Sequence, residues 1–303
     1  MSSAFALTET DSVSAASPSP KPVTRPLRVQ AFTGGHQDEV LAFLARRPIH
    51  TVFMSGLIRD NGLVSFANRG TFYGCRDKQG SLNGVALIGP KTVIEASDDE
   101  AFKLFAGLVP NNLTSHLIRG EKEQIDYVLE KYEAADRTPR LVTRELLLEQ
   151  TKPAGGVNAE PRLRLAHAED LESVISINAA LAFEETGLNP LLQDGQGMWA
   201  RTSRRIDQGR VWILVEKERL MFKADIISET PETVFVEGVF VPKEERRKGY
   251  GLRCMTQLAR NLIGRFESVS LVVNEENSNA RQFYTKLNFQ TRSPYSTAYF
   301  SAV

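Results

Sequence analysis

Val239-Phe-Val-Pro-Lys-Glu-Glu-Arg-Arg-Lys-Gly-Tyr-Gly-Leu252 is the stretch that decides the fold, because a predicted strand here gives way to a basic loop and then to a helix. The loop combines three cations with two glycines: Arg246, Arg247, Lys248, Gly249 and Gly251. Glycine permits a tight turn in which successive amide N–H groups point at one anion, and the start of a helix adds unpaired donors. Arg and Lys side chains neutralise phosphate oxygens. The pattern favours a diphosphate cradle, although a solvated basic turn before a helix has the same composition.

A second informative segment is Val273-Asn-Glu-Glu-Asn-Ser-Asn-Ala-Arg-Gln-Phe-Tyr-Thr-Lys-Leu-Asn-Phe289. Asn274 follows a predicted strand, Asn279 lies in the first turn of the next predicted helix, and Tyr284 lies deeper in that helix. A helical tyrosine beside Phe283 is ordinarily a core aromatic, and this interpretation stays open. The position of the segment, after the basic loop in the chain, favours a role at a ligand site instead.

Together the two segments resemble the GNAT superfamily of acyl-CoA-dependent N-acetyltransferases. The family signature, Arg or Gln followed by x-x-Gly-x-Gly/Ala, matches Arg246 to Gly251. The family's later Asn, Tyr and Leu-Gly-Phe-like ending correspond to Asn279, Tyr284 and Leu287-Asn-Phe289. Asn288 stands where glycine is usual, and asparagine tolerates the left-handed backbone conformation. The whole chain resembles the tandem group, in which a degenerate GNAT-like domain precedes an intact one.

The resemblance implies an α/β (α+β) fold of two GNAT-like domains, each a mixed, mostly antiparallel sheet with a splayed parallel strand pair and flanking helices. It implies an N-acetyltransferase that passes an acetyl group from acetyl-CoA to a primary amine by direct attack in a ternary complex. The strand residues expected to meet the pantetheine arm are Val239, Phe240 and Val241. The residues expected to hold the pyrophosphate are Arg246, Arg247, Lys248, Gly249, Tyr250, Gly251 and Leu252, with Asn274 or Asn279 bordering the cofactor. Tyr284 is expected near the thioester sulfur, where a phenol with a pKa of about 10 protonates the leaving thiolate.

Glu237 is the candidate base for the acceptor amine, because it interrupts an otherwise apolar strand just before the cofactor-binding residues. Alternation along a strand places its side chain on the same face as those of Val239 and Val241. We expect partial desolvation there to raise the basicity of the carboxylate. Two alternatives remain: a structural ion pair of Glu237 with Lys223 or an arginine on a neighbouring strand, and transfer of the proton through water.

The length of 303 residues predicts two domains. Residues 1–26 are rich in Ser and Pro and are interpreted as a disordered leader. We expect residues 27–152 to form the degenerate GNAT-like domain, 153–160 the linker, and 161–303 the catalytic domain. The halves share one order of predicted elements, with closing strands over Leu141 to Leu148 and around Phe289 and Tyr299-Phe300.

The first domain is expected to lack acetyl-CoA, because the turn equivalent to the basic loop reads Ala96-Ser-Asp-Asp-Glu-Ala101. It contains no glycine, and its three carboxylates stabilise a helix start but repel a diphosphate. This domain is expected to form a wall of the acceptor pocket or a subunit interface, and a purely structural role fits equally well. A homodimer is possible on the same grounds.

Composition excludes several other classes of function. Lys plus Arg and Asp plus Glu both number 37, so bulk attraction to nucleic acid or an anionic membrane is not the basis of function. No apolar run approaches the roughly 18 residues of a membrane span, and no secretory signal is evident. The two cysteines are expected to be buried, reduced thiols of a cytoplasmic protein, and the four scattered histidines predict no metal site.

Two readings compete with the transferase. The first is a non-catalytic acyl-CoA-binding regulatory module, against which an intact Tyr284 counts. The second is a site for another diphosphate such as a nucleotide, which is disfavoured because no P-loop Lys-Ser/Thr follows the glycines. The acidic pair Glu184 and Glu185 is interpreted either as an attraction for the acceptor ammonium or as a solvated helix end.

Overall fold

The computed structural model describes residues 27–301 except residue 113, so the leader predicted over residues 1–26 lies outside the described residues. The N-terminal half contains, in chain order, β1 (Arg28–Ala31), α1 (Gln37–Leu44), α2 (Pro48–Asn61), β2 (Thr71–Arg76), β3 (Leu82–Ile88), β4 (Lys91–Ala96), α3 (Asp99–Leu108), β5 (Leu117–Glu121), α4 (Lys122–Glu133) and β6 (Leu141–Gln150). The C-terminal half contains β7 (Arg164–Leu165), α5 (Leu171–Thr186), α6 (Pro190–Asp207), β8 (Val211–Glu216), β9 (Arg219–Glu229), β10 (Thr233–Phe240), α7 (Tyr250–Leu262), β11 (Ser268–Asn274), α8 (Ser278–Lys286) and β12 (Gln290–Tyr299).

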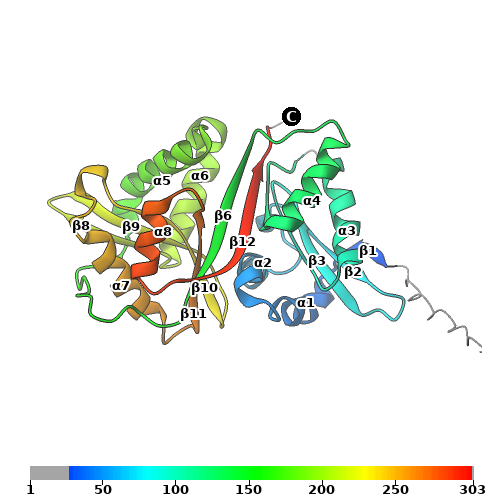
Figure 1. The fold of residues 1–303 in the computed structure, drawn as a ribbon, viewed down its shortest axis with the longest axis horizontal. Coiled ribbons are helices and arrows are strands. Elements are labelled where there is room, and N and C mark those ends of the chain that lie inside the picture. The colour runs from blue at the N-terminus through cyan, green and yellow to red at the C-terminus, as the bar shows by residue number, and fades with distance from the viewer. Residues whose placement is uncertain (1–26, 113, 302–303) are drawn as a thin grey trace, which may run out of the picture.

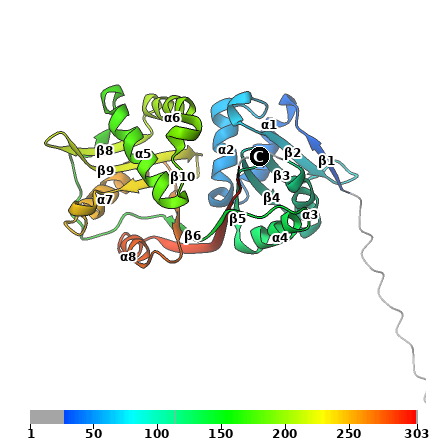
Figure 2. The ribbon, with the colours of Figure 1, turned by 90° about the horizontal axis from the view of Figure 1, so that it is seen from above.

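The strands form one sheet of 12 strands in the order β1-β2-β3-β4-β5-β12-β6-β11-β10-β9-β8-β7. Each half contributes one parallel pair, β4 with β5 and β10 with β11. The other paired strands are antiparallel. This confirms the predicted fold class, a mixed and mostly antiparallel sheet with one parallel pair in each half and helices around it (Figures 1 and 2).

The strands that close the two halves are exchanged at the middle of the sheet. β6 follows the N-terminal half in the chain but pairs with β11 of the C-terminal half. β12 pairs along β6 and also with β5, so the last described strand completes the sheet of the N-terminal half. Figure 1 shows β6 and β12 side by side between the halves. The predicted closing strands therefore exist, but each lies next to the sheet of the other half.

Helix α7 shows how sequence pattern fixes position. Its buried residues recur at helical spacing, so one stripe of the helix faces the sheet, and they are Cys254, Met255, Thr256, Leu258, Ala259 and Leu262. Four of these side chains, Cys254, Met255, Leu258 and Leu262, join a core with strands β9, β10 and β11. Gly249 begins the helix in the left-handed conformation, with φ +87°. The start of α7 lies beside Val241, just after the end of β10, where the basic loop emerges.

Helix α2 joins the halves. Pro48 occupies its first turn, where a missing N–H costs nothing, and the helix packs against β9 and β10. Ser228 donates a hydrogen bond to the carbonyl of Val52 (2.6 Å). A Cβ atom on Gly56 would lie 1.8 Å from Ser228 Oγ, so only glycine fits this close approach. A small apolar cluster of Val52, Leu147, Phe235 and Tyr295 fills the space between the halves.

Both cysteines, Cys75 and Cys254, are free and buried, as predicted. In the described part of the chain no helix is long and apolar enough to cross a membrane.

Candidate active site

Strands β10 and β11 separate before they end. Their parallel pairing stops at Phe235 and Ser270, whereas β10 continues to Phe240 and β11 to Asn274. On its other side β10 carries a bulge against β9, where the register shifts between Glu237 and Phe240. The separation leaves one edge of β10 open, with its backbone groups free to pair with a ligand.

A buried charge cluster supports this bulge. Gly238 has a φ of +61°, and its carbonyl accepts a hydrogen bond from Lys223 Nζ (3.1 Å). The Lys223 side chain is fully buried and pairs with Asp225 (2.9 Å), which also meets Arg205 (3.2 Å). Burial lowers the pKa of Lys223, and the neighbouring Asp225 opposes that effect. The cluster fixes the backbone that carries Glu237 and Val239.

A cleft of about 710 Å³ opens between the separated strands and helices α5 and α6. Most of its walls belong to the C-terminal half, but Arg119, Thr143 and Glu145 come from the N-terminal half. The sequence-predicted residues on its lining are Glu237, Val239, Asn274 and Tyr284. Phe240 and Val241 do not line it, and Val241 packs against the core beside Gly251.

The basic loop ends in a run of unpaired amides. Among the described residues, the backbone N–H groups of residues 247–252 donate no hydrogen bond. Arg247 adopts the left-handed conformation with φ +65°, and its side chain makes no hydrogen bond or ion pair within the described chain. Arg246 donates to the carbonyl of Val241 (3.2 Å), and Lys248 pairs with Glu245 (2.8 Å). The loop therefore offers six consecutive donors and one unengaged guanidinium at the start of α7.

Tyr284 lies on α8, with its ring packed edge-on against Phe283 and Phe289 at centroid distances of 5.1 and 5.4 Å. The side chain is buried, but it lines the cleft and its hydroxyl has no hydrogen-bond partner in the described chain. Burial raises the pKa of Tyr284, so the phenol stays protonated at neutral pH.

The asparagines lie differently from one another. Asn274 ends β11, lines the cleft, and accepts the amide of Glu276 (2.8 Å). Asn279 is exposed on the first turn of α8 and is not part of the lining. Asn277 caps α8 by accepting the amide of Ala280 (3.0 Å), and it does line the cleft. The sequence reasoning missed Asn277, although Asn is a preferred helix N-cap and its place before the helix was a usable signal.

Glu237 faces the cleft with 32% of its side chain exposed. Its Oε1 accepts a hydrogen bond from Arg119 Nη1 (2.7 Å), an arginine of β5 in the other half. Burial alone would raise the pKa of Glu237, but Arg119 and Lys91 outweigh it and the pKa is lowered. The expectation of increased basicity is therefore wrong in direction. Glu237 does form an ion pair, but with Arg119 rather than with Lys223 or a strand neighbour.

The acidic pair Glu184 and Glu185, in the last turn of α5, reaches the same cleft. Glu184 pairs with Lys243 of the basic loop segment (2.7 Å), and Glu185 accepts the hydroxyl of Tyr299 on β12 (2.7 Å). Both residues line the cleft. In the described residues no group of three or more His, Cys, Asp or Glu side chains is arranged to hold a metal ion.

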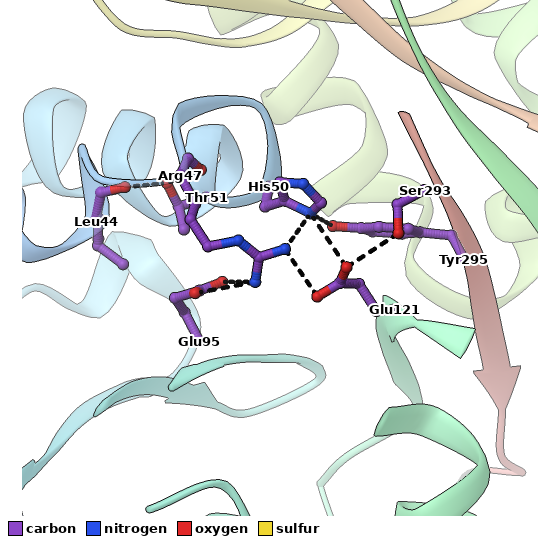
Figure 3. A network of polar contacts seen from close by, with 8 residues as sticks. All are labelled: Leu44, Arg47, His50, Thr51, Glu95, Glu121, Ser293 and Tyr295. Atoms are coloured by element: carbon purple, nitrogen blue, oxygen red, sulfur yellow. Dashed lines mark hydrogen bonds and ion pairs between the residues drawn. The ribbon is translucent and has the colours of Figure 1, made fainter. Parts of the chain in front are cut away.

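The N-terminal half has a comparable strand separation, but an ion pair spans it. Pairing of β4 and β5 stops at Thr92 and Ile118. Beyond that point Arg47 bridges Glu95 of β4 (3.2 Å) and Glu121 of β5 (2.8 Å), as Figure 3 shows. The cavity left there measures only about 40 Å³.

Two further features distinguish this N-terminal gap from the cleft. His50 and Ser293 complete the polar network around Glu121, with His50 also 2.9 Å from the hydroxyl of Tyr295. The helix start beyond β4 is already capped, because Asp98 accepts the amide of Ala101 (2.8 Å). The N-terminal gap is therefore filled and capped by protein side chains, whereas the C-terminal one is open.

Comparison with known proteins agrees with this geometry. A family model described as FR47-like protein matches residues 219–299, which span β9 to β12. No curated protein sequence matches the chain significantly. Among solved structures, a GCN5-related N-acetyltransferase from Sphaerobacter thermophilus is 12% identical, with a TM-score of 0.56 over 91% of this chain and 96% of its own. A GNAT-family acetyltransferase from Colwellia psychrerythraea is 13% identical, with a TM-score of 0.54 over 90% of this chain and 100% of its own.

The chain thus has the fold of the GNAT acetyltransferases. The likeness extends to a tandem GNAT protein from the clavulanic acid biosynthesis pathway, which is 12% identical, with a TM-score of 0.54 over 90% of this chain and 98% of its own. The resemblance inferred from the basic loop and the Asn–Tyr segment is confirmed for the fold and for its tandem arrangement.

Proposed function

We propose that the chain is an N-acetyltransferase that passes the acetyl group of acetyl-CoA to a primary amine, with one active site in the cleft of the C-terminal half. The observation that carries the proposal is the run of six unpaired amides at the start of α7, where Gly251 lies beside Val241 just after the end of β10. Consecutive free N–H groups at a helix start, with Arg247 unengaged beside them, suit the two phosphates of a diphosphate.

The open edge of β10 suits the rest of the cofactor. Beyond Phe235 this edge has no strand partner, and the bulge at Gly238 forms part of the cleft wall. A pantetheine arm carries amide groups that pair with an open strand edge much as an extended peptide does. Val239 is the strand residue that lines the cleft there, and Asn274 lines it from β11.

Two side chains of the cleft are proposed to move protons. Glu237 takes a proton from the acceptor nitrogen as the bond from nitrogen to the acetyl carbonyl carbon forms. Tyr284 gives its proton to sulfur as the carbon–sulfur bond breaks, and free coenzyme A leaves. Tyr284 suits this role because its buried phenol is protonated and makes no competing hydrogen bond within the described chain. Glu237 suits its role because its lowered pKa keeps it ionised at neutral pH.

The N-terminal half is proposed to bind no acetyl-CoA. The Arg47 bridge occupies the gap between β4 and β5, and the helix start beyond it is already capped by Asp98. Two further carboxylates, Asp99 and Glu100, lie in the first turn of α3 and repel a diphosphate.

Calorimetric titration of the full-length protein with acetyl-CoA tests the binding part of the proposal, with one site per chain expected. The same protein, incubated with acetyl-CoA and a panel of primary amines, is expected to release free thiol in proportion to the acetylated amine formed. Two sites per chain would contradict the assignment of the N-terminal half. Absence of binding would refute the proposal, and binding without thiol release from any amine would refute the transferase step.

A further inference from the structure

Arg119 belongs to β5 of the N-terminal half, yet its guanidinium contacts the candidate acceptor end of the cleft in the C-terminal half. Only 13% of its side chain is exposed. Its Nη1 donates to Glu237 Oε1 (2.7 Å), its Nε donates to Thr297 Oγ1 of β12 (2.8 Å), and Nε lies 3.5 Å from Glu145 Oε2 of β6. Thr297 in turn donates to Glu145 (2.8 Å). Two other strands besides that of Glu237 therefore hold the arginine, β12 through Thr297 and β6 through Glu145.

This geometry leaves the second carboxylate oxygen of Glu237 available. Within the described chain, Oε1 is engaged by Arg119 and Oε2 has no hydrogen-bond partner. A carboxylate with one oxygen fixed by a buried guanidinium has a defined orientation, because a charge-assisted bond of this length is strong and directional. The remaining oxygen is then presented to whatever occupies the cleft.

We propose that Arg119 is a positioning residue for the acceptor site: it fixes the Glu237 carboxylate in the cleft, so that the active site is completed across the two halves. The inference rests on the proposed transferase function. It assigns a task to the N-terminal half, which otherwise binds no cofactor. The exchanged strands β6 and β12 carry Glu145 and Thr297, the two residues that hold the arginine in place.

Several charged groups besides Arg119 lie near Glu237, and they determine how removal of Arg119 changes the pKa of Glu237. Lys91 of β4 and Arg205 of α6 lower the pKa of Glu237, as Arg119 does, whereas Glu145 of β6 lies beside the same guanidinium. Asp225 of β9 is the register partner of Glu237 and is occupied by Lys223 and Arg205. With Arg119 removed, burial and the negative charge of Glu145 both favour the neutral form of Glu237, and only Lys91 and Arg205 still favour its ionised form. The pKa of Glu237 is therefore expected to rise in an Arg119→Gln variant.

The direct test follows the carboxyl carbon of Glu237 by NMR during a pH titration of full-length protein labelled with ¹³C-glutamate. The Glu237→Gln variant identifies the signal. The expected result is a higher pKa in Arg119→Gln than in wild type, and a value close to wild type in Arg119→Lys, which keeps the charge. This readout needs no catalysis. An unchanged pKa in Arg119→Gln would overturn the inference, even if the transferase proposal stands.

Kinetics supply the second test. Arg119→Gln is expected to lower kcat/KM for the amine by about 100-fold, the cost of displacing a reacting group by roughly 1 Å. In the pH profile of kcat/KM, the acidic limb of this variant should move to higher pH, while its affinity for acetyl-CoA stays unchanged. The double variant Arg119→Gln, Glu237→Gln should lose little more kcat/KM than Arg119→Gln alone. Both substitutions impair the same functional unit, so their effects should not multiply. Fully multiplicative losses would overturn the inference, whereas wild-type protein that binds no acetyl-CoA or transfers no acetyl group would instead refute the proposed function.

Arg210→Gln is the matched control. Arg210 is also a nearly buried arginine in an ion pair between the halves, with Nη2 2.9 Å from Asp60 of α2. It does not line the cleft. If loosening the halves were the whole effect of Arg119→Gln, Arg210→Gln would reproduce both the kinetic loss and the shift in pH profile. Equal profiles for the two variants would overturn the positioning role.

Discussion

Reversing the charge of Arg247 is the sharpest test of the diphosphate cradle. Arg247 lies in the run of unpaired amides and has no partner among the described side chains, so its removal breaks no internal hydrogen bond or ion pair. It already adopts a left-handed backbone, and glutamate is no more strained there than arginine. Any loss of acetyl-CoA affinity in Arg247→Glu is therefore a loss of interaction with the ligand rather than of fold.

The magnitude follows from two contributions. Loss of one charge-assisted hydrogen bond costs about 1.5–3 kcal/mol. A new carboxylate about 6 Å from a phosphate, at an effective dielectric constant of about 40, adds roughly 1.4 kcal/mol of repulsion per phosphate charge. The total of about 3–4.4 kcal/mol corresponds to a dissociation constant raised by roughly 10²–10³-fold. Calorimetry in low salt measures it, and added salt should reduce the difference because the loop is exposed.

Arg265→Glu provides the matched control, since it changes the net charge equally. Arg265 is exposed just beyond the C-terminal end of α7, and a helix of 13 residues is about 20 Å long. This distance is twice the screening length of about 10 Å at 0.1 M salt. Equal affinities of Arg247→Glu and Arg265→Glu, or of Arg247→Glu and wild type, would refute the assignment of the basic loop as a phosphate site.

Two further predictions concern single side chains. Tyr284→Phe should bind acetyl-CoA as wild type does and lower kcat by about 10²-fold, the usual contribution of a general acid; unchanged turnover in a stopped-flow thiol assay would count against that role. Burial lowers the pKa of Lys91 to about 8 from its ordinary 10.5, so its charge disfavours the folded state below pH 8 and this cost disappears as pH rises toward 10.5. Lys91→Met should therefore unfold at a higher temperature than wild type at pH 7, with an advantage that shrinks above pH 8; a gain that is constant with pH, or one equalled by the exposed-site variant Lys103→Met, would contradict this.

The parts of the site that sequence reasoning found are local in the chain. The strand, basic loop and helix from Val239 to Leu252 are contiguous in the sequence. The glycines of this segment indicate a tight turn, and its Arg and Lys residues indicate a positive charge. The Asn–Tyr segment is equally contiguous, so Asn274 and Tyr284 were found there, while Asn279 and Asn277 differ by only half a helical turn. The fold class followed from the same segments, because each specifies a strand–helix unit.

The parts that it missed depend on contacts between distant segments. Arg119 meets Glu237 only because β5 and β10 lie on either side of the exchanged strands, and no spacing within either strand indicates that contact. Helix α2 was missed because Gly56, near its centre, weakens the helix propensity of the segment. Glycine is needed at this position because Ser228 of the other half lies against it. Lys223 and Asp225 did leave a signal, since two charges on one face of an otherwise apolar strand require buried partners.

The exchange of β6 and β12 also has a consequence for biosynthesis and folding. Strand β12 follows every other described strand in the chain, yet β5 lacks its second strand partner until β12 has been made. The N-terminal half therefore leaves the ribosome with an open strand edge and can close only after the C-terminal half has been made. Pairing over so long a separation in sequence predicts slow folding and a single unfolding transition for both halves. Each half thus protects an exposed strand edge of the other half from pairing with another chain.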